Sequence, residues 1–475
     1  MKKIILVAFA AFISSVSNVS AAVSTAKFEQ TPKFSEDSEN HSVLNMTTDR
    51  AVGKKITLGI KATGEVSLTG LKGVYEDNKM VEYEILSQNF SIAGDVVSLI
   101  CMGGEITSID AKEMPGLAIL LCGSNKLTSL DLAQNMAMTR LWCENNLIAE
   151  LKIGSKIIDN LACQMNKITH LDLTGQPELQ QLMAGDNPGI VLDFAKECKL
   201  MALDCSNAGL EKLDLTGCPQ LQELSCPNNK LTSLDLSGNP MLGILDCSRN
   251  SLVEVNLQNC VDLGSIDCSF NHLETLDLTH SENITEVYCQ NNKLKKLDIS
   301  ANTSIGSLAC DNNELEELTI GSNKLSAVWC YTNKLDNEDF QSVVTALNQR
   351  ETKRKGYLYA VDKKSTGEKN TCIPAVVEQA IAKNWKMLDY DGGSNNGAGI
   401  DYKGEIPSGM NPLGNGCVTI ISTNGKFACT PASSHIVKVY NESGAWVVND
   451  NLSSGTYIVE VQTPARRMVM KAFVK

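Results

Sequence analysis

Cysteine is the residue whose type and spacing in this sequence most plainly raise the question of chemistry. The chain has 17 cysteines, and eleven of them recur at steps of 20 or 21 residues, apart from one step of 42. A thiol can bind a metal ion, form a disulfide or fill a core as a small apolar group. The regularly spaced residues are Cys101, Cys122, Cys143, Cys163, Cys205, Cys226, Cys247, Cys268, Cys289, Cys310 and Cys330.

The spacing favours buried free thiols. The sequence has no C-x-x-C or H-x-x-x-H pair and only five histidines, so we predict no metal and no cofactor. A leucine two residues before the cysteine places both side chains on one face of a strand. Neighbouring strands lie about 4.8 Å apart with their side chains parallel, whereas a disulfide wants Cβ atoms about 3.8 Å apart. Cys198 and Cys218 fall on adjacent turns and stay open as a pair, as do Cys417 and Cys429.

The elements that hold these cysteines are copies of one repeat, L-x-C-x-x-N-x-L-x-x-L-D-L-S-x-N-x-x-L. One short parallel strand per copy, stacked on the next, buries a core that no single copy could form. The asparagine stands where the chain leaves the strand, and its amide offers a donor and an acceptor to buried backbone groups. With Ala184 filling the long step, we predict a leucine-rich repeat β-solenoid of about 12 repeats of 20–22 residues, with parallel strands on its concave face.

Residues 97–335, which contain the repeats, resemble the short bacterial leucine-rich repeats with a cysteine ladder found in internalin-J-like surface proteins. The match lies in cysteine replacing the second leucine of the strand in eleven copies. The resemblance implies a curved, right-handed solenoid displayed on a cell surface.

The N-terminal residues have the pattern of an export signal. Lys2 and Lys3 precede an uncharged apolar run at 4–13, and small residues mark a cleavage site after Ala21. The run is too short to span a bilayer and no later apolar stretch approaches about 18 residues, so we predict a signal peptide at 1–21 and no transmembrane segment. A polar segment and β-rich cap at 22–96 would cover the open end of the solenoid.

Composition excludes several functions. The 475-residue chain has 42 Lys and Arg against 55 Asp and Glu, a formal net charge of −13. Nucleic acids and anionic membranes need a broad basic face, so we predict neither as a partner. We also predict no enzyme activity and no catalytic residues, because the usual nucleophile, zinc and phosphate motifs are missing. Aspartates that recur nine residues after the cysteine should be structural or solvating on the outer side: Asp131, Asp172, Asp193, Asp214, Asp235, Asp277 and Asp298.

The period ends after the repeats. Residues 336–391 are predicted to form an α/β cap, followed by a linker at 392–412 and a small antiparallel β-sandwich at 413–475. The segment 452–459, with G-x-Y-x-V, and the basic-ended segment 471–475 resemble the C-terminal sorting domain of type IX secretion cargo. The resemblance implies contact with the type IX machinery, passage through a Gram-negative outer membrane, removal of the domain and attachment of the rest to lipopolysaccharide. An ordinary β-sandwich binding domain is the alternative.

Residues next to the cysteines should point to the concave face, which solenoids use for partners. This face has an apolar N-terminal third, an acidic middle and an aromatic C-terminal end, and exposed Trp and Tyr are typical anchors. Packing against the cap is the alternative for Trp329 and Tyr331, and simple solubility is the alternative for the aspartates. The candidate binding residues are Trp142, Asp204, Asp246, Asp267, Tyr288, Trp329 and Tyr331.

The sequence therefore predicts a non-enzymatic exported protein, secreted or held at the outer-membrane surface of a Gram-negative cell. We expect it to adhere to a protein or glycan on a host or bacterial surface, with biofilm formation as one setting. A structural coat protein without a specific ligand is the alternative. The fold alone does not identify the ligand, because concave faces of this kind serve many unrelated partners.

Overall fold

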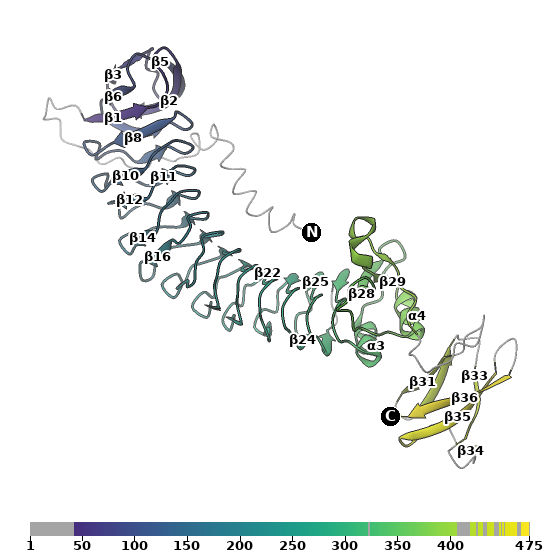
Figure 1. Cartoon of the computed structure of the whole chain (residues 1–475). Helices are drawn as coiled ribbons and strands as arrows, with labels where there is room; N and C mark the ends of the chain where they lie inside the picture. The colour runs from purple at the N-terminus through teal and green to yellow at the C-terminus, as the bar shows by residue number, and fades with distance from the viewer. Residues whose placement is uncertain are drawn as a thin grey trace. The chain divides into compact units, whose positions relative to one another are not determined.

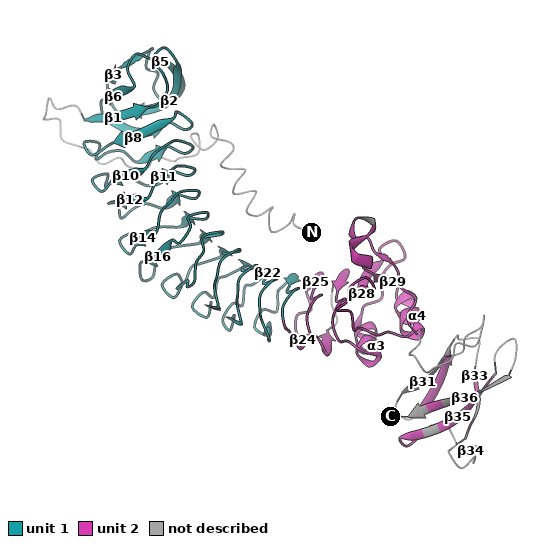
Figure 2. Ribbon diagram, viewed as in Figure 1, with its two compact units in different colours: residues 1–292 teal, residues 293–475 magenta. Residues whose placement is uncertain are grey.

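The computed structural model describes residues 42–321 and 324–405, together with 419–423, 426–430, 435–440, 446–447, 449–450, 452–462 and 467–474. The predicted signal peptide, the rest of the segment before residue 42 and Cys417 lie outside these residues. The chain divides into two compact units, residues 1–292 and 293–475 (Figure 2). Among the described helices, none is long and apolar enough to cross a membrane.

Unit 1 begins with antiparallel strands whose alternating apolar residues face a small core. β1 (Val43–Thr48) pairs with β6 (Asn89–Ala93) and β8 (Ile106–Asp110). β2 (Lys55–Ala62) pairs with β5 (Lys79–Ile85) and β7 (Val96–Ile100), and the short strands β3 (Ser67–Thr69) and β4 (Leu71–Lys72) pair with β6 and β5. β7 then pairs in parallel with β9 (Ile119–Leu121), the first solenoid strand, so its edge is covered.

One three-residue strand per repeat builds the main parallel sheet of unit 1. Equivalent positions face each other, as with Leu141 opposite Leu161. Strand β22 lies on the inner side of the bend of unit 1, and β14 and β16 on its outer side (Figure 1). After β9 come β11 (Arg140–Trp142), β13 (Asn160–Ala162), β15 (Gln181–Met183), β17 (Ala202–Asp204), β18 (Glu223–Ser225), β20 (Ile244–Asp246), β22 (Ser265–Asp267) and β23 (Glu286–Tyr288).

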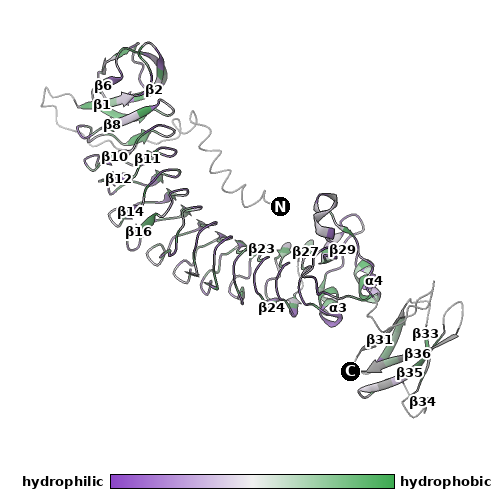
Figure 3. Ribbon diagram, in the orientation of Figure 1, coloured by the Kyte–Doolittle hydropathy of each residue, from purple (hydrophilic) through white to green (hydrophobic). Residues whose placement is uncertain are grey.

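The L-D-L segments, predicted to be extended, form short strand pairs on the outer side. Alternate residues are buried, as at Leu171 and Leu173 of β14, and the apolar residues of β16 are green in Figure 3. The parallel pairs in unit 1 are β10 (Ser129–Leu132) with β12 (Glu150–Ile153), β14 (His170–Leu173) with β16 (Val191–Phe194), and β19 (Ser233–Asp235) with β21 (Glu254–Asn256). The predicted leucine-rich repeat β-solenoid is confirmed.

The predicted asparagine ladder is also confirmed, and Asn250 shows its geometry. Its Nδ2 donates to the carbonyls of Cys226, one turn back, and Cys247, each at 3.0 Å. Its Oδ1 accepts from the backbone N–H of Leu231 at 3.0 Å. The same three bonds recur in unit 1 at Asn125, Asn146, Asn166, Asn187, Asn229, Asn271 and Asn292.

Unit 2 holds the last two predicted repeats and the region after them. β25 (Ser307–Ala309) and β27 (Ala327–Trp329) are inner strands, and β24 (Lys296–Ile299) pairs with β26 (Glu317–Ile320) outside. β27 continues in parallel into β28 (Gly356–Val361) and β29 (Trp385–Asp389). Part of the predicted linker is structured: the 3-10 turns η1 (Asp391–Gly393) and η2 (Asn395–Gly397) lead to β30 (Ile400–Asp401), which pairs with β29.

Two helices cover the end of this sheet. Helix α3 (Asn337–Ala346) begins at a capping box between Asp336 and Asp339 and buries Phe340, Val343 and Val344. Helix α4 (Pro374–Ala382) has its proline in the first turn, where a missing N–H costs nothing. Asn370, just before α4, donates to the carbonyls of Cys330 and Ala360 at 2.8 Å, so the asparagine ladder continues into the cap.

The C-terminal residues of unit 2 that are described form antiparallel strands. β31 (Thr419–Thr423) and β32 (Lys426–Thr430) make a hairpin. A second sheet has the order β34 (Trp446–Val447), β33 (His435–Tyr440), β35 (Gly455–Gln462) and β36 (Arg467–Val474). Their core contains Phe427, Val439, Tyr457, Val459 and Val461.

Candidate functional site

The strand face of unit 1 consists of the residues that flank the buried leucine and cysteine of each inner strand. The cysteine ladder lies beneath it, and each of the eleven predicted members is fully buried, with 0% of its side chain exposed. None of these eleven cysteines forms a disulfide in the described part of the chain. Burial raises the thiol pKa to about 12 at Cys101 and Cys163 and well above the ordinary value at Cys247. The ladder thiols are therefore unreactive core groups.

The N-terminal third of the strand face is a packed apolar ridge. Trp142, predicted to be an exposed anchor, is only 7% exposed and packs with Leu121, Ala162 and Met183. Its ring N–H donates to Asn160 Oδ1 at 2.7 Å. Residues at equivalent positions of consecutive strands stand about 4.8 Å apart, so neighbouring large side chains cover one another. The sequence showed the apolar character of this ridge but not its close packing.

An acidic row occupies the middle of the strand face, and we define it as Asp204, Asp246 and Asp267. Asp246 and Asp267 are direct partners on adjacent strands, while Ser225 separates Asp246 from Asp204. Each carboxylate accepts a hydrogen bond at 3.0 Å from the backbone N–H two residues later. No described side chain forms a salt bridge with these three carboxylates, although Arg249 is near enough to favour ionisation of two of them.

The pKa of every member of the acidic row is raised. Removal from water is the main cause, and neighbouring aspartates add repulsion at Asp204 and Asp267. Asp172, Asp214 and Asp277 on the outer side accept the same hydrogen bonds from a residue two positions on, and there these bonds lower the pKa because little desolvation opposes them. The local motif is thus the same on both sides of the solenoid. On the strand face, however, burial makes ionisation of the aspartates less favourable.

Tyr288 is half-buried at the register position next to Asp267. In unit 2 the predicted aromatic residues pack against the cap. Tyr331 is 8% exposed and stacks on Tyr390 with ring centroids 4.5 Å apart, and Trp329 stacks on Tyr359 at 5.3 Å. The buried Asp311 lies beside this cluster, and desolvation raises its pKa to about 6. Tyr331 therefore packs against the cap, as the alternative interpretation of this residue predicted.

A second ladder of buried side chains runs along unit 1, thirteen residues after most ladder cysteines. Most members donate to carbonyls of the preceding turn: Asn239 Nδ2, for example, reaches Leu215 and Cys218 at 3.1 and 2.8 Å. The consensus repeat has an asparagine at this position, but the sequence did not show that the whole column is a ladder, because its members share a donor group rather than a residue type. They are Asn135, Ser155, Gln176, Cys198, Cys218, Asn239, Cys260 and Ser281.

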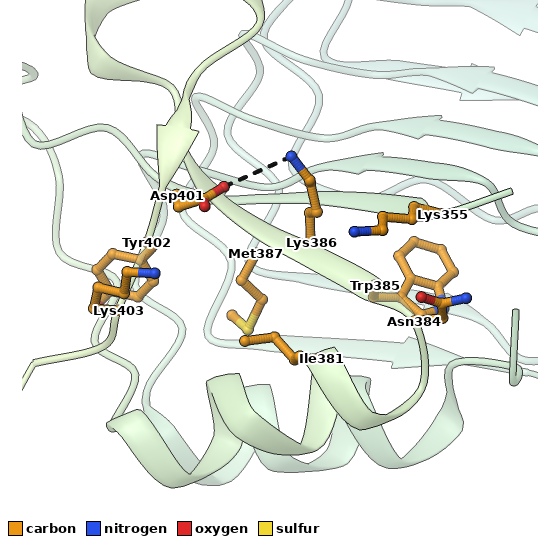
Figure 4. A pocket seen from close by; sticks show the side chains of 9 residues that line it. All are labelled: Lys355, Ile381, Asn384, Trp385, Lys386, Met387, Asp401, Tyr402 and Lys403. Carbon is orange, nitrogen blue, oxygen red and sulfur yellow. Dashed lines mark ion pairs between the residues drawn. The ribbon is translucent and has the colours of Figure 1, made fainter. Parts of the chain in front are cut away.

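A small pocket of about 170 Å³ lies in unit 2 between α4, β29 and the segment after β30 (Figure 4). Lys355, Lys386 and Lys403 line it together with Trp385, and Lys386 is 3.9 Å from Asp401. Solvated lysines and a loose ion pair do not define a ligand, so we assign this pocket no role. Among the described residues, no group of three or more metal-binding side chains is positioned to hold an ion.

Comparison with known proteins finds similar folds among solved structures. No family model matches the chain, and no curated protein matches it. The functional domain of InlJ from Listeria monocytogenes, which includes a cysteine ladder, is 21% identical with a TM-score of 0.44, covering 81% of this chain and 92% of that one. A leucine-rich repeat protein of Leptospira interrogans is 18% identical with a TM-score of 0.47, covering 58% and 73%. YopM from Yersinia pestis is 23% identical with a TM-score of 0.40, covering 46% and 62%.

Proposed function

We propose that this chain is a non-enzymatic binding protein of the cell surface that adheres to a protein or glycan through the strand face of unit 1. The observation that carries this proposal is the acidic row, three carboxylates at equivalent positions of the strand face whose pKa is raised by desolvation. Ionised carboxylates with a raised pKa lower the stability of the fold, whereas the outer-side aspartates do not. Residues that are kept despite such a loss of stability are candidates for binding residues.

The chemistry of the acidic row favours a partner with basic groups. An approaching Lys or Arg would pair with carboxylates that are already largely desolvated, so little further hydration would be lost. The outer-side aspartates are fully hydrated and offer no such advantage. A basic patch on a protein is therefore the favoured ligand, and a neutral glycan is the less favoured one.

Binding is also favoured over catalysis. The ladder thiols have a raised pKa and lack the thiolate that a cysteine nucleophile needs. Each aspartate of the acidic row accepts a hydrogen bond from a main-chain N–H within its own loop, which is the role of a turn-closing residue. Attachment to host or bacterial cells, including cells in a biofilm, is the activity that this surface supports.

The test measures binding of the labelled full chain to epithelial and bacterial cells. The informative variant is Asp204→Asn/Asp246→Asn/Asp267→Asn, and its matched control is Asp172→Asn/Asp214→Asn/Asp277→Asn, which changes net charge equally on the outer side. We expect saturable binding that weakens at least tenfold in the first variant and stays within twofold in the second. If both variants weakened binding equally, the effect would come from net charge and not from the acidic row. Absence of saturable binding would favour the structural coat protein.

We propose further that residues 413–475 are a type IX sorting domain, as the resemblance of 452–459 and 471–475 implies. The antiparallel order of β33, β35 and β36 is compatible with a compact sorting module. In a Gram-negative host with a type IX system, the chain without 413–475 should remain in the periplasm, while the full chain reaches the surface. Surface display of the truncated chain would contradict this assignment.

A further inference from the structure

Two members of the second ladder, Cys198 and Cys218, break its hydrogen-bonding rule. Other members reach carbonyls of the preceding turn, as Cys260 does toward Leu236 at 3.5 Å. Cys198 and Cys218 instead direct their sulfurs at each other, with Sγ atoms 3.1 Å apart. Both side chains are buried, at 2% and 0% exposure. A sulfur pair therefore stands where hydrogen bonds tie the turns elsewhere.

The backbone around the pair draws the two turns together. The N–H of Cys198 donates to the carbonyl of Gly217 at 2.9 Å, directly before Cys218. A Cβ atom at Gly217 would lie 2.7 Å from the carbonyl oxygen of Ala195, so only glycine permits this approach. The turns are thus locked at the separation that brings the sulfurs into contact.

We propose that Cys198 and Cys218 form a reversible disulfide that clips two consecutive turns of the solenoid. The co-reactant is a low-molecular-weight disulfide or a thiol–disulfide exchange protein. One cysteine thiolate attacks the oxidant, breaking its S–S bond and releasing one thiol, and the second cysteine then attacks the mixed disulfide and releases the other. One S–S bond forms in the chain, the two electrons reduce the oxidant to two thiols, and those thiols carry away the two protons.

The electrostatics of the pair support this order of events. The sulfur–sulfur hydrogen bond lowers the pKa of Cys198 and raises that of Cys218, so Cys198 is the first thiolate. The ladder cysteines lack this activation because burial raises their pKa. Exchange should therefore select this pair as the chain folds in an oxidising medium.

The test counts thiols and maps the bond. The reduced full chain is refolded in a buffer of reduced and oxidised glutathione, and the same buffer is applied to chain that was never unfolded. Free thiols are then alkylated in denaturant. We expect two fewer alkylated thiols than the 17 cysteines of the chain, and a non-reduced peptide that links Cys198 to Cys218. Full alkylation in both samples, or a bond to Cys205 or Cys226 instead, would overturn the proposal.

Variants separate this clip from general oxidation. Cys198→Ser or Cys218→Ser should leave all remaining thiols free, whereas Cys260→Ser, at the same position of another turn, should still lose two. The disulfide closes a loop of 20 residues, so oxidation should raise the thermal midpoint by several degrees in the unmodified chain and in Cys260→Ser. An equal rise on oxidation in Cys198→Ser would contradict the assignment.

Discussion

Replacement of Asn250 by alanine tests whether the asparagine ladder holds the solenoid together. The side chain is only 9% exposed and joins two consecutive turns. Its Nδ2 donates to the carbonyls of Cys226 and Cys247, and its Oδ1 accepts from the N–H of Leu231. The cost of Asn250→Ala depends on which of these three backbone groups keeps another partner.

The two carbonyls keep partners and the N–H does not. Cys226 also accepts from Asn229 at 3.0 Å, and Cys247 from Asn271 at 3.1 Å. The N–H of Leu231 is left buried without an acceptor, which costs about 1–3 kcal/mol, and the two lost donations cost about 1 kcal/mol together or somewhat more. We therefore expect Asn250→Ala to lower the free energy of unfolding by roughly 2–4 kcal/mol.

The chain itself shows how a missing asparagine is compensated. Ala208 occupies the ladder position of its turn, and the N–H that would need its side chain belongs to Gly189. Gly189 adopts a φ of +80° and donates instead to the backbone carbonyl of Ala208 at 2.7 Å. Glycine takes this conformation without steric cost, whereas Leu231, a core residue, does not. Asn250→Ala therefore has no such escape.

Urea unfolding of the full chain, followed by far-UV circular dichroism, measures the effect. Asn256→Ala is the matched control, because Asn256 lies in the same turn, is exposed and donates to Asp235 at 2.9 Å. Removing such a surface bond should cost at most about 0.5 kcal/mol. If Asn250→Ala were no more destabilising than Asn256→Ala, the ladder would not be the source of cohesion between turns.

Three further predictions concern pKa and backbone conformation. The pKa of Asp246 in the folded chain is raised, so its contribution to stability is present below pH 3.8 and is lost as the pH rises through the folded pKa. Asp246→Asn should therefore be more stable than the unmodified chain at pH 7. In urea titrations at several pH values, this difference should close below pH 3.8. The pKa of Asp311 is raised in the same direction, so the unmodified chain should lose stability between pH 3.8 and about 6. If Asp311→Asn lost as much stability over this pH range, the raised pKa of Asp311 would be refuted. Met165 has a φ of 58° and is 51% exposed, so Met165→Asn should raise the free energy of unfolding by about 0.5–1 kcal/mol, whereas Met165→Ala, which keeps the left-handed strain, should not.

The repeat and its two most regular columns could be predicted from the sequence because their members share a residue type. Cysteine and asparagine recur at fixed positions, and each column needs one chemical property that few residues supply. The second ladder was marked only by the second asparagine of the consensus, because Asn135, Ser155 and Gln176 share a hydrogen-bond donor and not a residue type. Asn370 escaped for a different reason: α3, β28 and the loops beside them separate it from Asn333, so it continues the ladder in space but not in the period.

Burial on the two sides of the solenoid is the property that the period does not specify. Asp246 and Asp277 both precede a residue two positions on that donates to them through its N–H and hydroxyl, and in the sequence the two motifs look alike. Desolvation on the inner sheet outweighs these hydrogen bonds and raises the pKa of Asp246, whereas at Asp277 the hydrogen bonds from Thr279 outweigh a smaller desolvation and lower the pKa. A solenoid can thus place one motif in two roles. On the outer side it closes a turn, and on the strand face it closes the same turn while holding a charge that a basic partner would stabilise.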